Sequence, residues 1–135
     1  MSEQAKQRVR EYYDRVINGR DLDAVAEFFS DERMVEGVRR GCFAYFEAFP
    51  DMHVSLDELI AEGESVFLRS TLTGTHDGEY KGIPATGRHV ATECAEVFRI
   101  RDDRFVGYWC LTNVAGLMRQ LTEEPALEAV STTAT

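Results

Sequence analysis

The chain has 135 residues, with 15 Lys and Arg against 24 Asp and Glu, so its formal net charge is −9. This length fits one domain, and 44% hydrophobic residues are enough for a core that needs no metal or disulfide to hold it together. Nucleic acids and anionic membrane surfaces are bound through clustered Lys and Arg. We therefore expect neither nucleic acid nor membrane as a partner.

The three cysteines, Cys42, Cys94 and Cys110, cannot all pair with one another and form no CxxC motif. Reduced thiols are typical of the cytoplasm. The N-terminal stretch lacks the apolar region of a signal peptide, and no apolar run approaches the length of a membrane span. The sequence therefore predicts a cytoplasmic protein.

Helical periodicity dominates the first part of the chain. An apolar stripe from Val9 to Ile17 predicts an amphipathic helix. Asp21 is placed to cap a second helix. Ser30 or Asp31 is placed to cap a third helix, which Pro50 would stop.

The hydrophobic period then changes to two, which is typical of strands. The strands are expected at 53–59, 64–75, 89–100 and 104–112. Asp102 and Asp103 would form the tight turn between the last two.

A long Gly- and Pro-containing loop, 76–88, separates two of the predicted strands, and we expect it to cover the mouth of a cavity. A short helix should follow Asn113. Residues 122–135 are expected to form a mobile C-terminal tail, which leaves a single domain over 1–121.

Helices first and strands last indicate an α+β fold. We expect a cone-shaped barrel made by a curved antiparallel sheet with the N-terminal helices packed on its concave face. The interior of such a cone is the default site for a ligand.

Three segments carry a resemblance to a known family. They are NGRDLDAVAEFF (18–29), LIAEGESVFLRSTLTGTHDGEYKGIPATGRHV (59–90) and EVFRIRDDRFVGYW (96–109). Together they closely resemble SnoaL-like polyketide cyclases of the nuclear-transport-factor-2-like superfamily, which also contains ketosteroid isomerases and limonene epoxide hydrolases. The resemblance covers roughly residues 8–121 and implies the cone-shaped fold and a homodimer packed through the outer face of the sheet.

The resemblance also implies roles for individual residues. Tyr13 lies where ketosteroid isomerases have a tyrosine that donates to the substrate oxygen, and Glu96 lies where they have a protonated aspartate sharing that task. Cys110 stands where relatives commonly have a catalytic aspartate. The strand and loop that supply the general base in ketosteroid isomerases are missing before the third helix, so neither usual base carboxylate is present.

Strand alternation by itself points Glu96 inward, beside Cys94 and Phe98 and facing Tyr108. Burial without an opposing cation raises the pKa of a carboxyl, and a neutral acid can donate a hydrogen bond to a substrate oxygen. The predicted catalytic residues are Glu96, Tyr13 and Tyr108. The alternative is that Glu96 is a structural acid bonded to an inward tyrosine.

The expected cavity wall is largely apolar and suits a bulky, mostly hydrocarbon ligand with a few oxygens. Its predicted substrate-binding residues are Phe28, Phe46, Phe49, Met52, Leu68, Ser70, Leu72, His76, Thr92, Cys94, Phe98, Cys110 and Thr112. The three histidines are isolated in the sequence, so we expect no metal, and nothing points to a cofactor.

The opposite face of the sheet should carry Phe67, Arg69 and Trp109 together with an outward row at 91, 93 and 95. Trp and Arg are enriched at protein interfaces. This face is the predicted homodimer interface.

These features favour a cyclase of bacterial secondary metabolism that closes a ring in a hydrophobic polyketide-type intermediate. Ring closure would proceed by carbonyl polarisation or by a pericyclic reaction such as a cycloaddition, without an aspartate base. One alternative is a non-catalytic protein that binds a hydrophobic metabolite. Another is an isomerase or epoxide hydrolase of the same superfamily.

Overall fold

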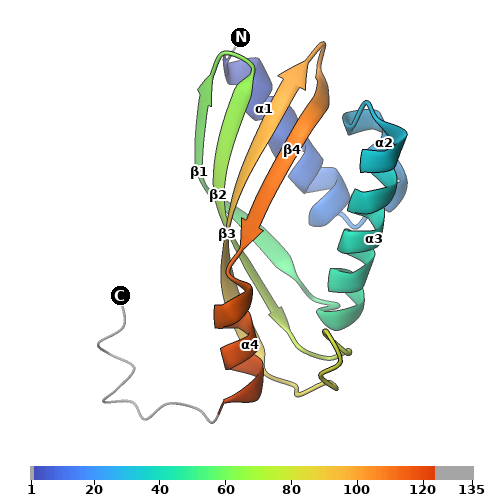
Figure 1. Ribbon diagram of the computed structural model, residues 1–135, viewed down its shortest axis with the longest axis vertical. Coiled ribbons are helices and arrows are strands. Elements are labelled where there is room, and N and C mark those ends of the chain that lie inside the picture. Colours follow the sequence, from blue (N-terminus) through green and yellow to red (C-terminus); the bar gives the residue numbers. More distant parts are fainter. Residues whose placement is uncertain (1, 124–135) are drawn as a thin grey trace.

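A computed structural model describes residues 2–123 (Figure 1). The N-terminal elements are helix α1 (Ser2–Tyr12), a π-helical turn (Tyr13–Ile17), a 3-10 turn (Leu22–Ala24), α2 (Val25–Phe28) and α3 (Glu32–Ala48). The remaining elements are strands β1 (His53–Glu62), β2 (Ser65–Thr75), β3 (His89–Arg101) and β4 (Arg104–Thr112), and helix α4 (Val114–Thr122).

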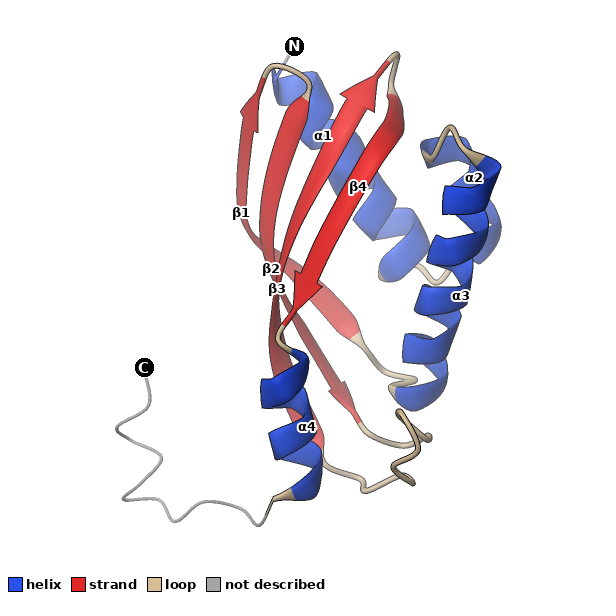
Figure 2. Cartoon of the chain, viewed as in Figure 1, coloured by secondary structure: helices blue, strands red, loops and turns tan. Residues whose placement is uncertain are grey.

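The four strands form one antiparallel sheet in the order β1-β2-β3-β4. The sheet is curved, and α1, α2 and α3 lie on one side of it (Figure 2). It does not close on itself, so β1 and β4 are edges. The α+β class and the position of the helices are confirmed, and the helices complete the wall that the open sheet leaves unfinished.

An aromatic cluster holds the N-terminal helices against the sheet. The ring centroid of Tyr12 lies 5.5 to 6.0 Å from those of Phe28, Phe29, Phe98 and Phe105. All five side chains are buried. Such edge-to-face arrangements are favoured by the ring quadrupoles, so this cluster fixes where α1 crosses the strands.

The predicted strands and the turn between β3 and β4 are confirmed. Asp102 and Asp103 have φ values of 52° and 65°, as a two-residue hairpin of matching twist requires. The register across β3 and β4 pairs Glu96 with Cys110 and Cys94 with Thr112. Alternation from this register places Glu96 on the concave, helix-covered face.

The first predicted helix is present and ends where expected, but it starts earlier, at Ser2, and differs in type at its end. Its last part is π-helical, because the Asn18 N–H donates to the carbonyl of Tyr13 at 2.8 Å. In an α-helix each backbone N–H bonds the carbonyl four residues earlier, and in a π-helix the carbonyl five residues earlier. An apolar stripe looks much the same in both, so the sequence pattern missed this turn.

Of the predicted helix caps, one is absent and one is confirmed. The Asp21 side chain makes no capping hydrogen bond, and the second helix is only a 3-10 turn followed by one α-helical turn. Asp31 caps α3 as predicted, because its side chain accepts from the N–H of Arg33 at 2.7 Å. Ser30, the alternative cap, instead donates from its backbone N–H to Phe105.

The loop 76–88 is tied to the end of α3. The N–H groups of Asp77 and Gly78 both donate to the carbonyl of Ala48 at 3.1 Å. His76 is fully buried, and its Nδ1 accepts from the N–H of Thr86. The first residues of the loop and the buried side chains of His76 and Tyr80 are therefore packed at the end of α3, whereas most of its other residues are exposed.

Helix α4 begins at Val114 and is capped by Asn113, whose side chain accepts from the N–H of Gly116 at 2.9 Å. It extends through Thr122, one residue into the predicted tail, and residues 124–135 of that tail lie outside the described residues. Within residues 2–123, no helix is long and apolar enough to cross a membrane.

Candidate functional site

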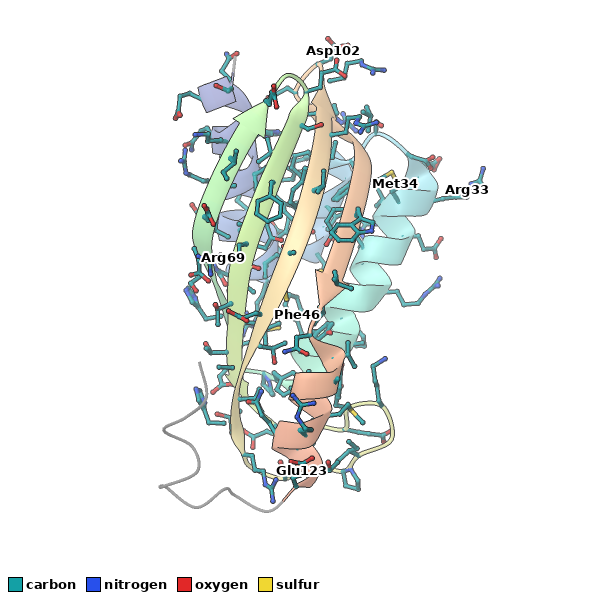
Figure 3. All side chains as sticks on the ribbon, turned by 60° about the vertical axis from the view of Figure 1, so that its left-hand side comes forward. Arg33, Met34, Phe46, Arg69, Asp102 and Glu123 are labelled. Carbon is teal, nitrogen blue, oxygen red and sulfur yellow. The ribbon has the colours of Figure 1, made fainter. Side chains whose placement is uncertain are left out.

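A cavity of about 410 Å³ lies between the concave face of the sheet, the first helix and α3. It is lined by Tyr12, Tyr13, Ile17, Met34, Gly37, Val38, Gly41, Cys42, Tyr45, Met52, Val54, Ser70, Leu72, Cys94, Glu96, Tyr108, Cys110 and Thr112. Near the start of α3, Met34 lines this cavity, whereas Arg33 beside it projects away from the body of the molecule (Figure 3).

The lining has one carboxyl group. Its other side chains are tyrosines, cysteines, a serine, a threonine and apolar residues. Among the described residues that line the cavity there is no Lys, Arg or His. Such a wall favours a largely hydrocarbon ligand and offers polar contacts at few points. The position of those points decides what the cavity can do.

Two tyrosines from different elements meet at the carboxyl group of Glu96 on β3. Tyr13, from the first residue of the π-helical turn, donates its hydroxyl to Oε1. Tyr108, from β4, donates its hydroxyl to Oε2 at 2.6 Å. Glu96 is only 5% exposed, so its carboxyl is held between two phenols inside the cavity wall.

Burial raises the pKa of Glu96, and the hydrogen bonds from Tyr108 and Tyr13 only partly oppose that rise. Burial also raises the pKa of Tyr13 and of Tyr108, and the neighbouring Glu96 carboxylate raises both further. All three groups therefore hold their protons more strongly than they would in water.

A neutral Glu96 changes the direction of one hydrogen bond. Its own proton needs an acceptor, and the nearest acceptors are the two phenol oxygens. When Glu96 donates to Tyr108, the proton of that phenol is released to point at a ligand. The chain from carboxyl to phenol to ligand is a polarised donor of the kind that stabilises charge developing on an oxygen.

The three cysteines all line the cavity as thiols. The pKa values of Cys42 and Cys94 are raised to about 11, chiefly by burial. Burial also raises the pKa of Cys110. A reactive thiolate needs a lowered pKa, so these side chains serve as wall.

Many of the predicted site residues do line the cavity. They are Tyr13, Met52, Ser70, Leu72, Cys94, Glu96, Tyr108, Cys110 and Thr112. That they act on a substrate stays a prediction, which the proposals below take up.

Other predicted lining residues lie behind the wall. Phe28, Phe49, Leu68 and Phe98 are fully buried in the core, and Thr92 is nearly so. None of them is among the lining residues. The alternation of residues predicts which face of a strand or helix a side chain is on. It does not predict whether other side chains cover that residue and keep it out of the cavity.

Two further predicted contacts belong to other parts of the fold. Phe46 lies outside the lining and its ring is covered by the guanidinium of Arg20, at 5.0 Å. His76 is held inside the loop 76–88 through Thr86. The prediction that this loop covers the cavity mouth is wrong, because no residue of it lines the cavity. Its backbone is bonded instead to the far end of α3.

Sequence reasoning missed most of the contribution of α3. Gly37 and Gly41 line the cavity and are exposed, four residues apart on the same face of the helix. Glycines are unfavourable in the middle of a helix. A pair of them four residues apart was therefore the sequence signal that this face of α3 borders a cavity. Within the described residues, no cluster of His, Cys, Asp and Glu could hold a metal ion.

Comparison with known proteins gives the family. A family model for SnoaL-like polyketide cyclases matches residues 7–121. The chain therefore belongs to the SnoaL-like polyketide cyclase family. Among curated protein sequences, none matches this chain.

Solved structures share the fold over nearly the whole chain. TsrD from Streptomyces laurentii is 26% identical, covers 92% of this chain and 98% of its own, and superposes with a TM-score of 0.82. AclR from Streptomyces galilaeus, a candidate hydroxylase, is 25% identical, with 98% and 90% covered and a TM-score of 0.82. IdmH from Streptomyces antibioticus, a candidate polyketide cyclase, is 24% identical, with 87% and 98% covered and a TM-score of 0.75.

Proposed function

We propose that this protein is a cyclase that closes a ring in a hydrophobic, oxygen-bearing polyketide-type intermediate by polarising a carbonyl group. Membership of the SnoaL-like polyketide cyclase family supports the reaction class. The carboxyl of Glu96 held between Tyr13 and Tyr108 supports the mechanism. The mostly apolar lining of the cavity supports the kind of substrate.

Each part of the site has a role in this proposal. The apolar walls fold a flexible chain so that its reacting ends meet, which removes much of the entropic barrier to ring closure. The Glu96–Tyr108 pair donates to the carbonyl oxygen and stabilises the negative charge that grows there. Because burial favours the protonated form of Glu96 and no other carboxyl lines the cavity among the described residues, proton abstraction by a carboxylate plays little part in this proposal.

Variants at Glu96 test the mechanism. We expect Glu96→Ala to convert a poly-β-keto substrate ~10²-fold more slowly or worse, because a preorganised donor is lost. Glu96→Gln keeps the shape and a donor, so it should lose less. The rate of ring closure is followed by the change in absorbance as the conjugated product forms, with Glu93→Gln, an exposed carboxyl on the other face of β3, as the control.

The outcomes separate the candidate functions. If Glu96→Ala converts substrate as fast as the wild type, Glu96 is structural, and closure driven by cavity shape, as in a cycloaddition, replaces polarisation. If the wild type is protected against unfolding by ligand but yields no product, the protein is a binder of hydrophobic metabolites, the alternative that loss of the usual aspartate also suits.

We propose in addition that two copies pair through the convex face of the sheet. Ile60, Phe67, Val97 and Trp109 are paired in one row across all four strands on that face. Ile60 and Trp109 are each 53% exposed in the single chain, and Leu111 is 61% exposed. An exposed apolar row of this length is typical of an interface and fits a second copy with the same row.

A further inference from the structure

The lining of the cavity is exposed on one side only. Its residues on the first helix, β1 and β2 are all buried, whereas Gly37 and Gly41 on α3 and Cys110 on β4 are exposed. The other lining residues of α3 and β4 are half-buried, namely Met34, Val38, Cys42, Tyr45, Tyr108 and Thr112. A cavity meets solvent where its lining is exposed, so this one opens between α3 and β4. We call the opening bordered by Gly37, Gly41 and Cys110 the lateral mouth.

The lateral mouth lies beside a free edge of the sheet. Helix α3 stands next to β4 (Figures 2 and 3), and residues 107–112 of β4 pair only with β3 within the described chain. The hydrogen bonds of α3 go elsewhere, since Arg39 donates to Leu22 in the 3-10 turn and Ala48 accepts from Asp77. None in the described chain joins α3 to β4. This side of the cavity is therefore not closed by backbone or side-chain bonds.

The two glycines of α3 both lie at the lateral mouth. They are four residues apart, which is about 6 Å along the helix axis. A Cβ built on Gly37 or Gly41 meets nothing within 4 Å, so close packing does not require glycine at either position. Glycine is among the least favourable residues inside a helix. Its presence at both positions is accounted for by an open passage into the cavity.

We propose that the ligand enters and leaves the cavity through the lateral mouth, and that the missing side chains of Gly37 and Gly41 set how wide a ligand can pass. This inference rests on the proposed function only in taking the cavity as the ligand site. The two glycines act on passage and not on the reaction. A ring-closed product is wider and stiffer than the open chain that forms it, so the width of the mouth bears most on product release.

Stopped-flow fluorescence with two rigid fluorescent probes tests the passage. 2-Naphthol is the narrower probe and 9-phenanthrol is the wider one. Gly37→Leu and Gly41→Leu each place a side chain in the mouth, and leucine is a good helix former, so α3 should persist. Ala44→Leu is the matched control, because Ala44 is exposed on the same helix and does not line the cavity. Circular dichroism verifies the fold of each variant.

We expect the association and dissociation rate constants of 2-naphthol both to fall about tenfold in Gly37→Leu and Gly41→Leu, with Kd changed less than about twofold. A narrowed passage raises the barrier equally in both directions, whereas a lost wall contact changes the affinity. 9-Phenanthrol should be slowed more than 2-naphthol. Gly41→Ala should slow both probes by a smaller factor, and Ala44→Leu should leave all rate constants unchanged.

Unchanged rate constants in both leucine variants, or a changed Kd with an unchanged association rate, overturn the lateral entrance and leave the proposed function standing. Equal slowing in Ala44→Leu also overturns it, because the effect would then belong to α3 as a whole. If the wild type binds neither probe, the ligand site of the proposed function fails, and the entrance fails with it.

Discussion

At the scale of the residue, Glu96 is the one carboxyl in the cavity lining, and its surroundings decide its charge. Burial raises its pKa, and no cationic side chain shares the lining among the described residues. Its position on the inner face was predictable from alternation in β3. Its bond to Tyr108 joins neighbouring strands of one hairpin and was within reach of the predicted pairing, whereas its bond to Tyr13 joins residues 83 positions apart and depends on where the first helix crosses the sheet.

A raised pKa in the folded protein makes stability depend on pH in a defined direction. Between the ordinary glutamate pKa of about 4.3 and the raised value, the folded state holds a proton that the unfolded state releases. Glu96 therefore makes its whole contribution to the free energy of unfolding when the pH is below the ordinary glutamate pKa. That contribution is lost as the pH rises through the raised pKa of Glu96 in the folded protein.

We expect the wild type to lose stability relative to Glu96→Gln as pH increases above about 4.3, because glutamine does not titrate. Urea unfolding of both proteins across this range gives the difference directly. Carboxylates with a lowered pKa, such as Asp51 and Glu64, lose their stabilising contribution when acid protonates them. This loss is the same in both proteins, so it cancels in the difference between them. A difference that stays constant with pH contradicts a neutral buried Glu96.

At the scale of the element, helix α3 and the π-helical turn form the wall of the cavity opposite the sheet. The π-helical turn begins at Tyr13 and changes the angle at which the following residues leave the helix. Helix α3 brings two glycines to the cavity, and a Cβ built on either meets nothing within 4 Å. The space beside α3 is thus kept open by missing side chains.

We expect Gly37→Ala and Gly41→Ala each to stabilise the fold by up to about 1 kcal/mol, because alanine is the better helix former and the added methyl group has room. Gly63→Ala is the matched control. Its Cβ also meets nothing within 4 Å, but its φ of +60° disfavours any side chain, so it should destabilise. Denaturant unfolding measures all three, and a loss of stability in the α3 variants would show that these positions are not open.

In the loop 76–88, replacing a glycine by alanine is expected to destabilise the fold. A Cβ on Gly78 would lie 1.9 Å from the carbonyl oxygen of Glu47, at the end of α3. Gly78→Ala should therefore destabilise the protein by ~1–3 kcal/mol and loosen the hydrogen bonds of Asp77 and Gly78 to Ala48. Thermal unfolding and amide hydrogen exchange at these N–H groups check it. Wild-type stability in this variant would mean that the loop does not pack closely on α3.

At the scale of the whole molecule, one face of the open sheet is covered by helices and the other is bare over much of its length. Arg69 lies on the bare face (Figure 3), between Glu58 and Ala95 in the strand pairing. In the proposed dimer, charged residues at the side of the apolar row would favour one orientation of the two copies.

We expect the wild type to sediment as a dimer at micromolar concentration and Trp109→Glu to sediment as a monomer with an unchanged circular dichroism spectrum. A charge buried against the apolar row of the partner copy has no partner there. Phe43→Glu is the control, because Phe43 is 56% exposed but lies on α3, away from the sheet face. A monomeric wild type removes the proposed interface.

The sequence by itself determined the α+β class, the four strands, the turn at Asp102 and Asp103, and the inward direction of Glu96. These follow from periodicity and turn chemistry, which act between near neighbours in the chain. Only the tertiary structure decided which inward residues reach the cavity. Phe98 and Leu68 face the same way as Glu96 but are covered by the aromatic and aliphatic core.

The tertiary structure also decided that the start of the loop 76–88 is bonded to the end of α3 and that Tyr13 reaches the carboxyl of Glu96. The physical reason is that these contacts join segments far apart in sequence. Their formation depends on the curvature of the sheet and on the angle at which α1 and α3 cross it, which no local pattern encodes.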